Sequence, residues 1–310
     1  MTVGSQVLRI GTRASRLARW QTDQVVRLIG NRRPALACVV VPMATEGDGD
    51  VRTPLPEIGG RGVFSEALEQ ALLGGGIDLA VHSLKDLPVE ETPGLSIAAT
   101  CCREDPRDVM ISRERWTLAT LPSAAVVGTC STRRQAQLLA ARPDLDIRPL
   151  RGNVDTRVRR ALDGDYGAIV IAAAGVLRLG LGASIAEYLS LDAFLPAPGQ
   201  GALAIQCRGD DEATREVVSA LDEPDVRAAV DAERTFLAAL GGGCSAPIAA
   251  FGRVERSGPA PRLHLAGLVG SRDGRRMIRV AGEADVEQAA ALGRRLADAA
   301  RAQGAAALLA

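Results

Sequence analysis

The sequence predicts an α/β fold in which helices cover largely parallel or mixed sheets, followed by a small α+β domain. Two observations indicate this. Short apolar strands alternate with amphipathic helices up to about residue 200, and after Pro224 the pattern changes to one long helix, three strands and a final helix. The chain has 310 residues, of which 47% are hydrophobic, so two or three domains can each bury a core.

The first part of the chain begins with an apolar strand at 7–12 and an amphipathic helix that Ser15 can cap. The segment 36–43 is typical of a buried strand, and Ser65 is a plausible N-cap for a helix that ends at glycines. The strand in "GIDLAVHSLKDLP" runs into a loop, and "LSIAAT" is the next strand. The stretch 44–62 is rich in Gly, Pro and charge, which predicts a mobile loop or lid.

A second unit starts near Pro106 and repeats the alternation. Its expected strands and helices are "AAVVGT", "STRRQAQLLAARP", "DIRPLRG", "VDTRVRRALDGD" and "GAIVIAA". The segment 194–207 interrupts this pattern with prolines and glycines and then becomes a strand, which indicates a crossover between domains. The C-terminal part is predicted as a helix at 225–240, three strands and an Ala-rich helix.

Composition excludes several classes of protein. A formal net charge of zero argues against a partner bound by bulk charge, either nucleic acid or a membrane surface. The N-terminus lacks the basic start and apolar run of a signal peptide, and no apolar run reaches the length of a membrane span, so we expect a cytoplasmic protein. Six cysteines form no C-x-x-C pair, and with two histidines no metal site is expected.

Arginines recur where predicted strands give way to helices. Ligands of open α/β sheets bind outside the carboxyl ends of strands, and guanidinium groups grip carboxylates or phosphates. The pattern therefore predicts a polyanionic ligand with many carboxylates. The alternative is that these arginines are ordinary solvated surface residues without a ligand. No P-loop pattern is present, which argues against a nucleotide. The arginines are Arg13, Arg133, Arg134, Arg151, Arg157 and Arg178.

Two further features are candidates for chemistry. Lys85 is the single lysine among 37 basic residues, and Asp86 follows it after a strand. This pair is either a surface turn or an electrostatic group whose ionised Asp86 stabilises a cation. Cys244 follows three glycines in "ALGGGCSAPIAAF", and it is either a buried thiol in a turn or a thiolate that carries a covalent group. A cysteine hydrolase needs a histidine, and His82 and His264 support one poorly.

Together these stretches resemble the porphobilinogen deaminase (hydroxymethylbilane synthase) family. The similar pieces run in order from residue 9 to about 248. They are "GTRASRLARWQ", "GGRGVFSEALEQALL", "DLAVHSLKDLPVE", "REDPRDVMIS", "VVGTCSTRRQAQLLAARPDL", "LRGNVDTRVRRAL", "AAAGVLRLGL", "LPAPGQGALAIQCR" and "GGGCSAPI".

The resemblance implies a transferase of porphyrin, tetrapyrrole and haem biosynthesis. It would join four porphobilinogen molecules head to tail, release ammonia each time, and free hydroxymethylbilane by hydrolysis. It also implies a dipyrromethane cofactor attached to Cys244 through a thioether, with Asp86 as the catalytic carboxylate. The implied partners are porphobilinogen and the growing polypyrrole chain, with neither nucleic acid nor membrane, and the family suggests a monomer.

The resemblance also assigns the other site residues and the domains. The implied cofactor ligands are Ser83, Lys85, Asp86, Thr129, Ser131, Arg133, Arg134 and Gly152. The implied substrate ligands are Arg13, Ser15, Gln21, Arg151, Arg157, Arg178 and Gln200, the last of these in the interdomain cleft. The family fold has two domains like periplasmic binding proteins and a small third one. Here they would be 1–101 with 201–219, then 102–200, and then 220–310.

Two positions depart from the family pattern. Arg61 replaces a common Lys in the lid, and Cys130 replaces a common Ser, which puts a second thiol near the cofactor. Two alternative functions stay open at this point. One is a non-catalytic polycarboxylate-binding protein of the periplasmic type, and the other is a thiol-dependent hydrolase.

Overall fold

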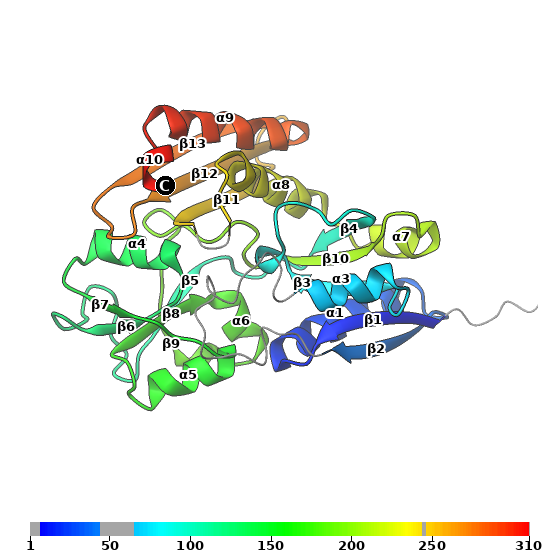
Figure 1. The fold of residues 1–310 in the computed structure, drawn as a ribbon, viewed down its shortest axis with the longest axis horizontal. Helices are drawn as coiled ribbons and strands as arrows, with labels where there is room; N and C mark the ends of the chain where they lie inside the picture. Colours follow the sequence, from blue (N-terminus) through cyan, green and yellow to red (C-terminus); the bar gives the residue numbers. More distant parts are fainter. Residues whose placement is uncertain (1–6, 44–64, 244–245, 310) are drawn as a thin grey trace, which may run out of the picture. The chain divides into compact units, whose positions relative to one another are not determined.

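The computed structural model describes residues 7–43, 65–243 and 246–309 (Figure 1). The chain divides into two compact units. One comprises residues 1–103 and 202–227, and the other comprises residues 104–201 and 228–310. The predicted lid at 44–62, Arg61 and Cys244 lie outside the described residues. No helix in the part of the chain that the structure describes is long and apolar enough to cross a membrane.

The first unit contains a five-stranded sheet with the order β2-β1-β3-β10-β4. Its strands are β1 (Val7–Arg13), β2 (Ala37–Met43), β3 (Leu79–Ser83), β4 (Leu95–Cys101) and β10 (Leu203–Arg208). β1 pairs in parallel with β2 and β3, whereas β10 lies antiparallel between β3 and β4. The helices of this unit are α1 (Arg16–Arg32), α3 (Glu66–Leu73) and α7 (Glu212–Ser219).

Buried aliphatic side chains hold this sheet to its helices. Ile10 of β1 and Val25 of α1 are fully buried in one core cluster, and Leu68 of α3 is fully buried in a second cluster. Gly11 makes the approach of α3 possible, since a Cβ there would lie 3.0 Å from a methyl of Leu68 and 2.3 Å from one of Ile77. Arg13 is the last residue of β1 and therefore lies at the end of the sheet where the carboxyl end of this strand emerges.

The second unit contains another five-stranded mixed sheet, with the order β7-β6-β8-β5-β9. Its strands are β5 (Asp108–Ile111), β6 (Val126–Gly128), β7 (Asp146–Arg148), β8 (Ala168–Ala172) and β9 (Ile185–Tyr188). β6 runs parallel to β7 and β8, and β5 is antiparallel to β8 and β9. The helices α4 (Thr132–Ala141), α5 (Val154–Leu162) and α6 (Ala173–Arg178) follow β6, β7 and β8.

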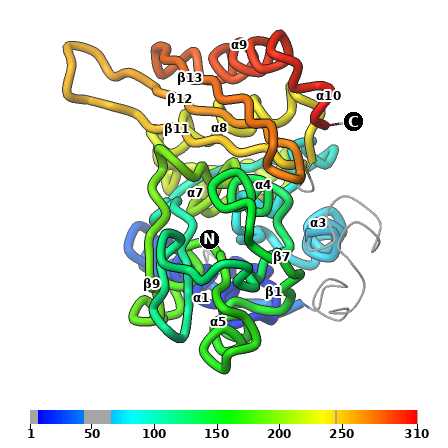
Figure 2. The backbone as a smooth tube through the Cα atoms, turned by 90° about the vertical axis from the view of Figure 1, so that its left-hand side faces the viewer, coloured from blue at the N-terminus to red at the C-terminus, as the bar shows by residue number. Residues whose placement is uncertain are grey.

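The same unit includes a small antiparallel sheet near the C-terminus. Its strands are β11 (Ile248–Glu255), β12 (Arg262–Gly270) and β13 (Met277–Asp285), which pair in sequence order. α9 (Ala289–Ala302) contacts β12 and β13 and lies along this sheet, as Figure 2 shows. Phe236 of α8 (Pro224–Ala239) is fully buried, and its ring packs against β12 because Gly267 has no side chain. A Cβ at Gly267 would lie 2.5 Å from the ring.

The predicted fold class is confirmed by these sheets, since two mixed α/β sheets are followed by a separate small sheet with helices. Ser15 caps α1 as predicted, and its side-chain oxygen accepts a hydrogen bond from the amide of Ala18 at 3.3 Å. Ser65 precedes α3 as predicted but makes no capping hydrogen bond with its side chain. The strands β5 and β9 were not predicted from the sequence pattern. The three-domain boundaries stay a prediction.

Candidate functional site

In the first unit, predicted site residues meet where the parallel strands β1 and β3 end. Arg13 is the last residue of β1 and Ser83 the last of β3, and these strands are neighbours. Because carboxyl ends of parallel strands share a sheet edge, the two residues lie on one edge. Gln21 of α1 is buried and its Nε2 donates to Ser83 Oγ at 2.8 Å, which orients the hydroxyl.

Lys85 and Asp86 lie on a short 3₁₀ helix, Leu84–Asp86, that directly follows β3. Leu84 anchors this turn, because its side chain is fully buried and its amide donates to the carbonyl of Ala202 at 3.0 Å. Lys85 is half-buried and Asp86 is exposed. The anchored backbone therefore presents an acidic and a basic side chain to solvent from a fixed position, which suits a group that acts on a charged ligand.

His82 is a buried neighbour of this turn that the sequence analysis considered only for a hydrolase. Burial lowers the pKa of His82 to about 4, although Gln206 partly offsets this and the charge of Arg13 adds to it. The imidazole is therefore neutral at pH 7. Its Nε2 is buried and has no hydrogen-bond partner among the described residues. With a pKa of about 4 this imidazole is a weak base, so His82 does not supply the general base that the hydrolase alternative needs.

In the second unit, the start of α4 gathers a second group of predicted residues. Ser131 is the N-cap of α4 and its Oγ accepts from the amide of Arg134 at 3.4 Å. Thr129 is buried just before it, and its Oγ1 accepts from the amide of Ser131 at 3.2 Å. Cys130 between them is an exposed thiol.

Arg133 and Arg134 are buried, and both bind the carboxylate of Asp108 on β5. Arg133 Nη1 donates to one carboxylate oxygen at 2.6 Å and Arg134 Nη2 to the other at 2.7 Å. Burial by itself would raise the pKa of Asp108, but the charges and hydrogen bonds of the two arginines hold it well below its usual range. Arg134 Nε is buried without a hydrogen-bond partner among the residues described.

Gln200 completes this network from the segment before β10. It is fully buried, and its Nε2 donates to Asp108 at 2.8 Å and to the carbonyl of Pro106 at 2.7 Å. Asp108 therefore accepts hydrogen bonds from three side chains within one unit. Sequence reasoning missed Asp108, although two adjacent arginines at a predicted strand exit are a signal that a buried acid accompanies them.

The remaining candidate arginines of the second unit follow β7 and β8. Arg157 Nε donates to the carbonyl of Gly152 at 2.6 Å, and Gly152 has a φ of +110°, which favours glycine. Arg151 Nη1 is buried with no hydrogen-bond partner in the described ranges. Arg178 is buried, and its Nη2 donates to the carbonyl of Gly201 at 2.6 Å. Hydrogen bonds to the main chain thus position the guanidinium groups of Arg157 and Arg178, which suits them to bind anions.

The structure thus collects the described candidates into two groups, one in each unit. The first comprises Arg13, Ser15, Gln21, Ser83, Lys85 and Asp86. The second comprises Thr129, Ser131, Arg133, Arg134, Arg151, Gly152, Arg157, Arg178 and Gln200. Their roles toward a ligand stay predictions.

These features define the chain as an α/β protein with cationic side chains at strand ends, a class suited to anionic ligands. Comparison with known proteins gives the family. Residues 8–216 match the family described as "Porphobilinogen deaminase, dipyromethane cofactor binding domain", and residues 228–302 match "Porphobilinogen deaminase, C-terminal domain". The chain belongs to the porphobilinogen deaminase family, so the predicted family and its cofactor class are confirmed.

A curated relative agrees with this assignment along almost the whole chain. Porphobilinogen deaminase of Syntrophotalea carbinolica is 47% identical over 308 residues, which cover 99% of this chain and 96% of that protein.

Solved structures resemble the chain more distantly. A sulfate-bound regulatory domain of OxyR2 from Vibrio vulnificus is 20% identical with a TM-score of 0.41, covering 71% of this chain and 99% of that one. The periplasmic VFT2 domain of BvgS from Bordetella pertussis is 14% identical with a TM-score of 0.41, covering 69% and 85%. These resemblances are too distant to bear on function.

Proposed function

We propose that this chain is a transferase that joins four porphobilinogen molecules head to tail with loss of ammonia and then releases hydroxymethylbilane by hydrolysis. The observation that carries the proposal is the family match over both parts of the chain, 8–216 and 228–302. The proposal includes a dipyrromethane cofactor joined to Cys244 by a thioether, and a monomeric protein. The competing function, a non-catalytic polycarboxylate-binding protein, shares the arginines but needs neither the family's cofactor nor Asp86.

The chain's own groups fit a cofactor and substrate that carry carboxylates. Buried guanidinium nitrogens of Arg134 and Arg151 have no hydrogen-bond partner among the described residues. A buried donor without a partner costs about 1–3 kcal/mol, so a bound carboxylate would remove that cost at each position. Arg133 already binds Asp108 and the carbonyl of Leu195, which suits it for holding the start of α4 as well as for any contact with the cofactor.

The chemistry that the cofactor supplies when bound is a free pyrrole position to which each new unit is joined. Asp86 is the residue that stabilises the positive charge formed during the reaction. Loss of ammonia leaves positive charge on the substrate, and an ionised carboxylate at a fixed position stabilises it. The buried side chain of Leu84 fixes that position, and Lys85 provides an adjacent cation for a carboxylate of the ligand.

The Gln21–Ser83 pair lies directly before the turn that carries Asp86 and adds an oriented polar group. Gln21 Nε2 and Ser83 Oγ share a 2.8 Å hydrogen bond, which leaves the Ser83 hydroxyl oriented by the protein. Preorganised groups need no reorientation when charge develops, which is the largest usual source of rate acceleration. The roles of Arg13, Arg157 and Arg178 in this proposal are to bind acetate and propionate groups of the substrate and the growing chain.

Intact-mass spectrometry of the purified protein tests the proposal directly. The wild-type chain should exceed its sequence mass by an adduct of two pyrrole units, and Cys244→Ser should match its sequence mass and form no bilane. Cys130→Ser is the matched control, because its exposed thiol should not carry the adduct. An adduct that persists in Cys244→Ser would overturn the anchor. A wild-type chain with neither adduct nor bilane formation would favour the polycarboxylate-binding alternative.

The monomeric state has its own measurement. Sedimentation velocity of the wild-type protein should give a single species of about the 32.4 kDa chain mass. A species of twice that mass at micromolar concentration would contradict the proposal of a monomer.

A further inference from the structure

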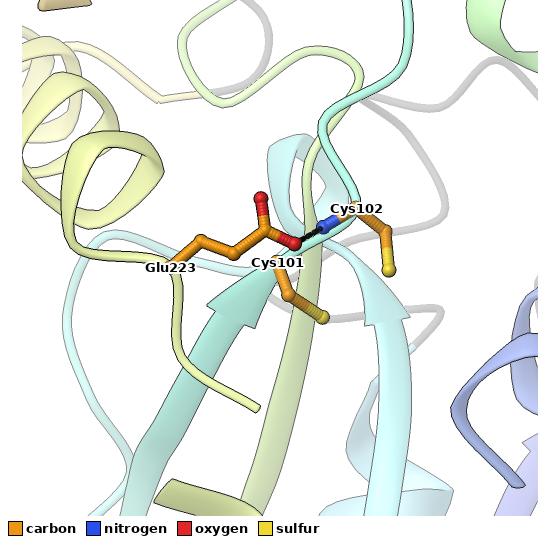
Figure 3. Close-up of side chains that lie close together, drawn as sticks. All are labelled: Cys101, Cys102 and Glu223. Atoms are coloured by element: carbon orange, nitrogen blue, oxygen red, sulfur yellow. Dashed lines mark hydrogen bonds between the residues drawn. The ribbon is translucent and has the colours of Figure 1, made fainter. Parts of the chain in front are cut away.

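Two adjacent cysteines and a carboxylate converge where β4 ends. Cys101 is the last residue of β4 and is buried, Cys102 is half-buried, and Glu223 immediately precedes α8. The two Sγ atoms and one Glu223 carboxylate oxygen all lie within 4.8 Å of one another. Figure 3 shows Glu223 reaching from its own segment to the turn that carries both cysteines. All three residues belong to the first unit.

The backbone of Cys102 explains how neighbouring residues bring their sulfurs together. Successive side chains of a regular strand point to opposite faces. Cys102 instead has a φ of +53°, in the left-handed region that few residues with a side chain adopt. This conformation interrupts the alternation, and such backbone strain is concentrated at functional sites.

Hydrogen bonds from the segment before α8 hold this arrangement. The amide of Cys102 donates to Glu223 Oε1 at 2.9 Å, and the amide of Glu223 donates to the carbonyl of Thr100 at 3.0 Å. Asp222 accepts from the amide of Thr100 at 2.6 Å and is itself bound by Arg227 at 2.8 Å. The carboxylate of Glu223 is therefore positioned by the fold and is not a freely moving surface group.

Carboxylates lie beside the two thiols. An oxygen of Glu223 lies within 4.8 Å of both sulfurs, and Asp222 accepts from the amide of Thr100, the residue before Cys101. These negative groups stabilise a bound positive charge, and a metal ion deprotonates the thiols that it binds.

We propose that Cys101, Cys102 and Glu223 form a site for a thiophilic divalent cation of the zinc class. Two thiolates and one carboxylate oxygen are its protein ligands, and water completes a tetrahedron. Zinc binds sulfur at about 2.3 Å and carboxylate oxygen at about 2.0–2.2 Å. The three ligand atoms already lie within 4.8 Å of one another, so rotation of the half-buried Cys102 side chain, with Glu223 held in place, can bring them to these distances. Thiolates select this class of ion over Mg²⁺ and Ca²⁺, which take oxygen ligands.

Binding would displace one proton from each thiol to solvent as each sulfur forms its bond to the metal. The site lies beside the two points, after Arg103 and after Arg227, at which the chain leaves the first unit. A bound cation would therefore join the end of β4 to the start of α8. The sequence pattern did not predict this site, because neither C-x-x-C spacing nor a nearby histidine marks it.

Calorimetric titration of the full-length, reduced protein with Zn²⁺ alone, in buffers of different ionisation enthalpy, tests the proposal. We expect one ion per chain and release of about two protons. Cys102→Ser should weaken binding about 100-fold or more and Glu223→Gln about tenfold, since loss of even an outer-shell partner costs about 10–100-fold. Cys38→Ser is the control and should bind as the wild type does, because its thiol lies on β2, at the opposite edge of the sheet from β4.

A second probe separates lost ligation from lost folding. Cd²⁺ should produce an ultraviolet thiolate-to-metal charge-transfer band in the wild type and in Cys38→Ser, and a weaker band in Cys102→Ser. Circular dichroism and urea unfolding of each variant show whether it is folded. A folded Cys102→Ser that binds Zn²⁺ as tightly as the wild type would overturn the proposal. So would a wild-type protein that binds no Zn²⁺ and forms only a Cys101–Cys102 disulfide on mild oxidation.

Discussion

Asp108→Asn is the substitution for which the structure predicts the largest loss of stability. One carboxylate oxygen of Asp108 accepts from Arg134 at 2.7 Å and from Gln200 at 2.8 Å, and the other accepts from Arg133 at 2.6 Å. The amide group of Asn has one acceptor oxygen and one donor nitrogen. Either orientation of the amide therefore directs its NH₂ group at a buried guanidinium donor.

The magnitude comes from the burial of all three charges. Asp108 is fully buried, and the side chains of Arg133 and Arg134 are 5% and 8% exposed. Removing one partner of a buried ion pair costs about 3–5 kcal/mol, because the remaining charge stays buried without compensation. We therefore expect the free energy of unfolding to fall by about 3–5 kcal/mol at pH 7. The exposed pair of Arg148 and Asp146 supplies the control, and Asp146→Asn should cost at most about 1 kcal/mol.

The pH dependence gives an independent measurement. The pKa of Asp108 is lower in the folded than in the unfolded protein, so its contribution is complete above the unfolded value of about 4 and is lost as pH falls further. Urea unfolding at pH 7 and at pH 3 should show the difference between wild type and Asp108→Asn shrinking at the lower pH. A difference below about 1 kcal/mol at pH 7, or one that grows as pH falls, would refute the reasoning.

Asp86→Asn should lower the rate of bilane formation about 10²–10³-fold when wild type and variant carry the same amount of cofactor adduct, and Asp86→Glu should retain more activity. Equal rates for wild type and Asp86→Asn would show that the charge of Asp86 does not matter. Glu233 accepts from the amides of Gly199 and Gly252 at 2.6 Å each, so Glu233→Gln should reduce the free energy of unfolding in urea by about 1.5–3 kcal/mol, and no loss would contradict this. Gly252→Ala places a Cβ 2.8 Å from a main-chain oxygen of α8 and should cost about 1–3 kcal/mol, whereas Gly30→Ala in α1 meets nothing within 4 Å and should stabilise by up to about 1 kcal/mol. Thermal melts of both glycine variants check this contrast.

The sequence pattern predicted the fold because local signals and tertiary structure agree for most strands and helices. The apolar run at 36–43 became β2, Ser15 capped α1, and the strand expected at the end of 194–207 became β10 in the first sheet. The short strands β5 and β9 carry too few residues for a clear period, so their positions depend on pairing with β8 and with each other.

The candidate site was predictable where side chains follow strands, and less so where distant segments meet. Arginines at strand exits stand out in the sequence, but the contact of Asp108 with Arg133 and Arg134 depends on β5 lying beside β8 in the sheet. The positive φ of Cys102 has no sequence signal, since glycine or asparagine is the usual marker of that conformation. The contact of Glu223 with Cys102 likewise joins residues that are 121 positions apart in the chain, so no local pattern predicts it.

β10 follows the first segment of the second unit in the chain, so it is synthesised after the other four strands of its sheet. β10 lies between β3 and β4, and within the part of the chain that the structure describes β4 pairs with no other strand. A ribosome that has reached Gly201 has already made residues 104–201 of the second unit, while the first sheet still lacks its joining strand. The turn that carries Asp86 is fixed only once Ala202 can accept the hydrogen bond from Leu84. The sheet of the first unit can therefore be completed only after about two-thirds of the chain has been translated, when β10 becomes available.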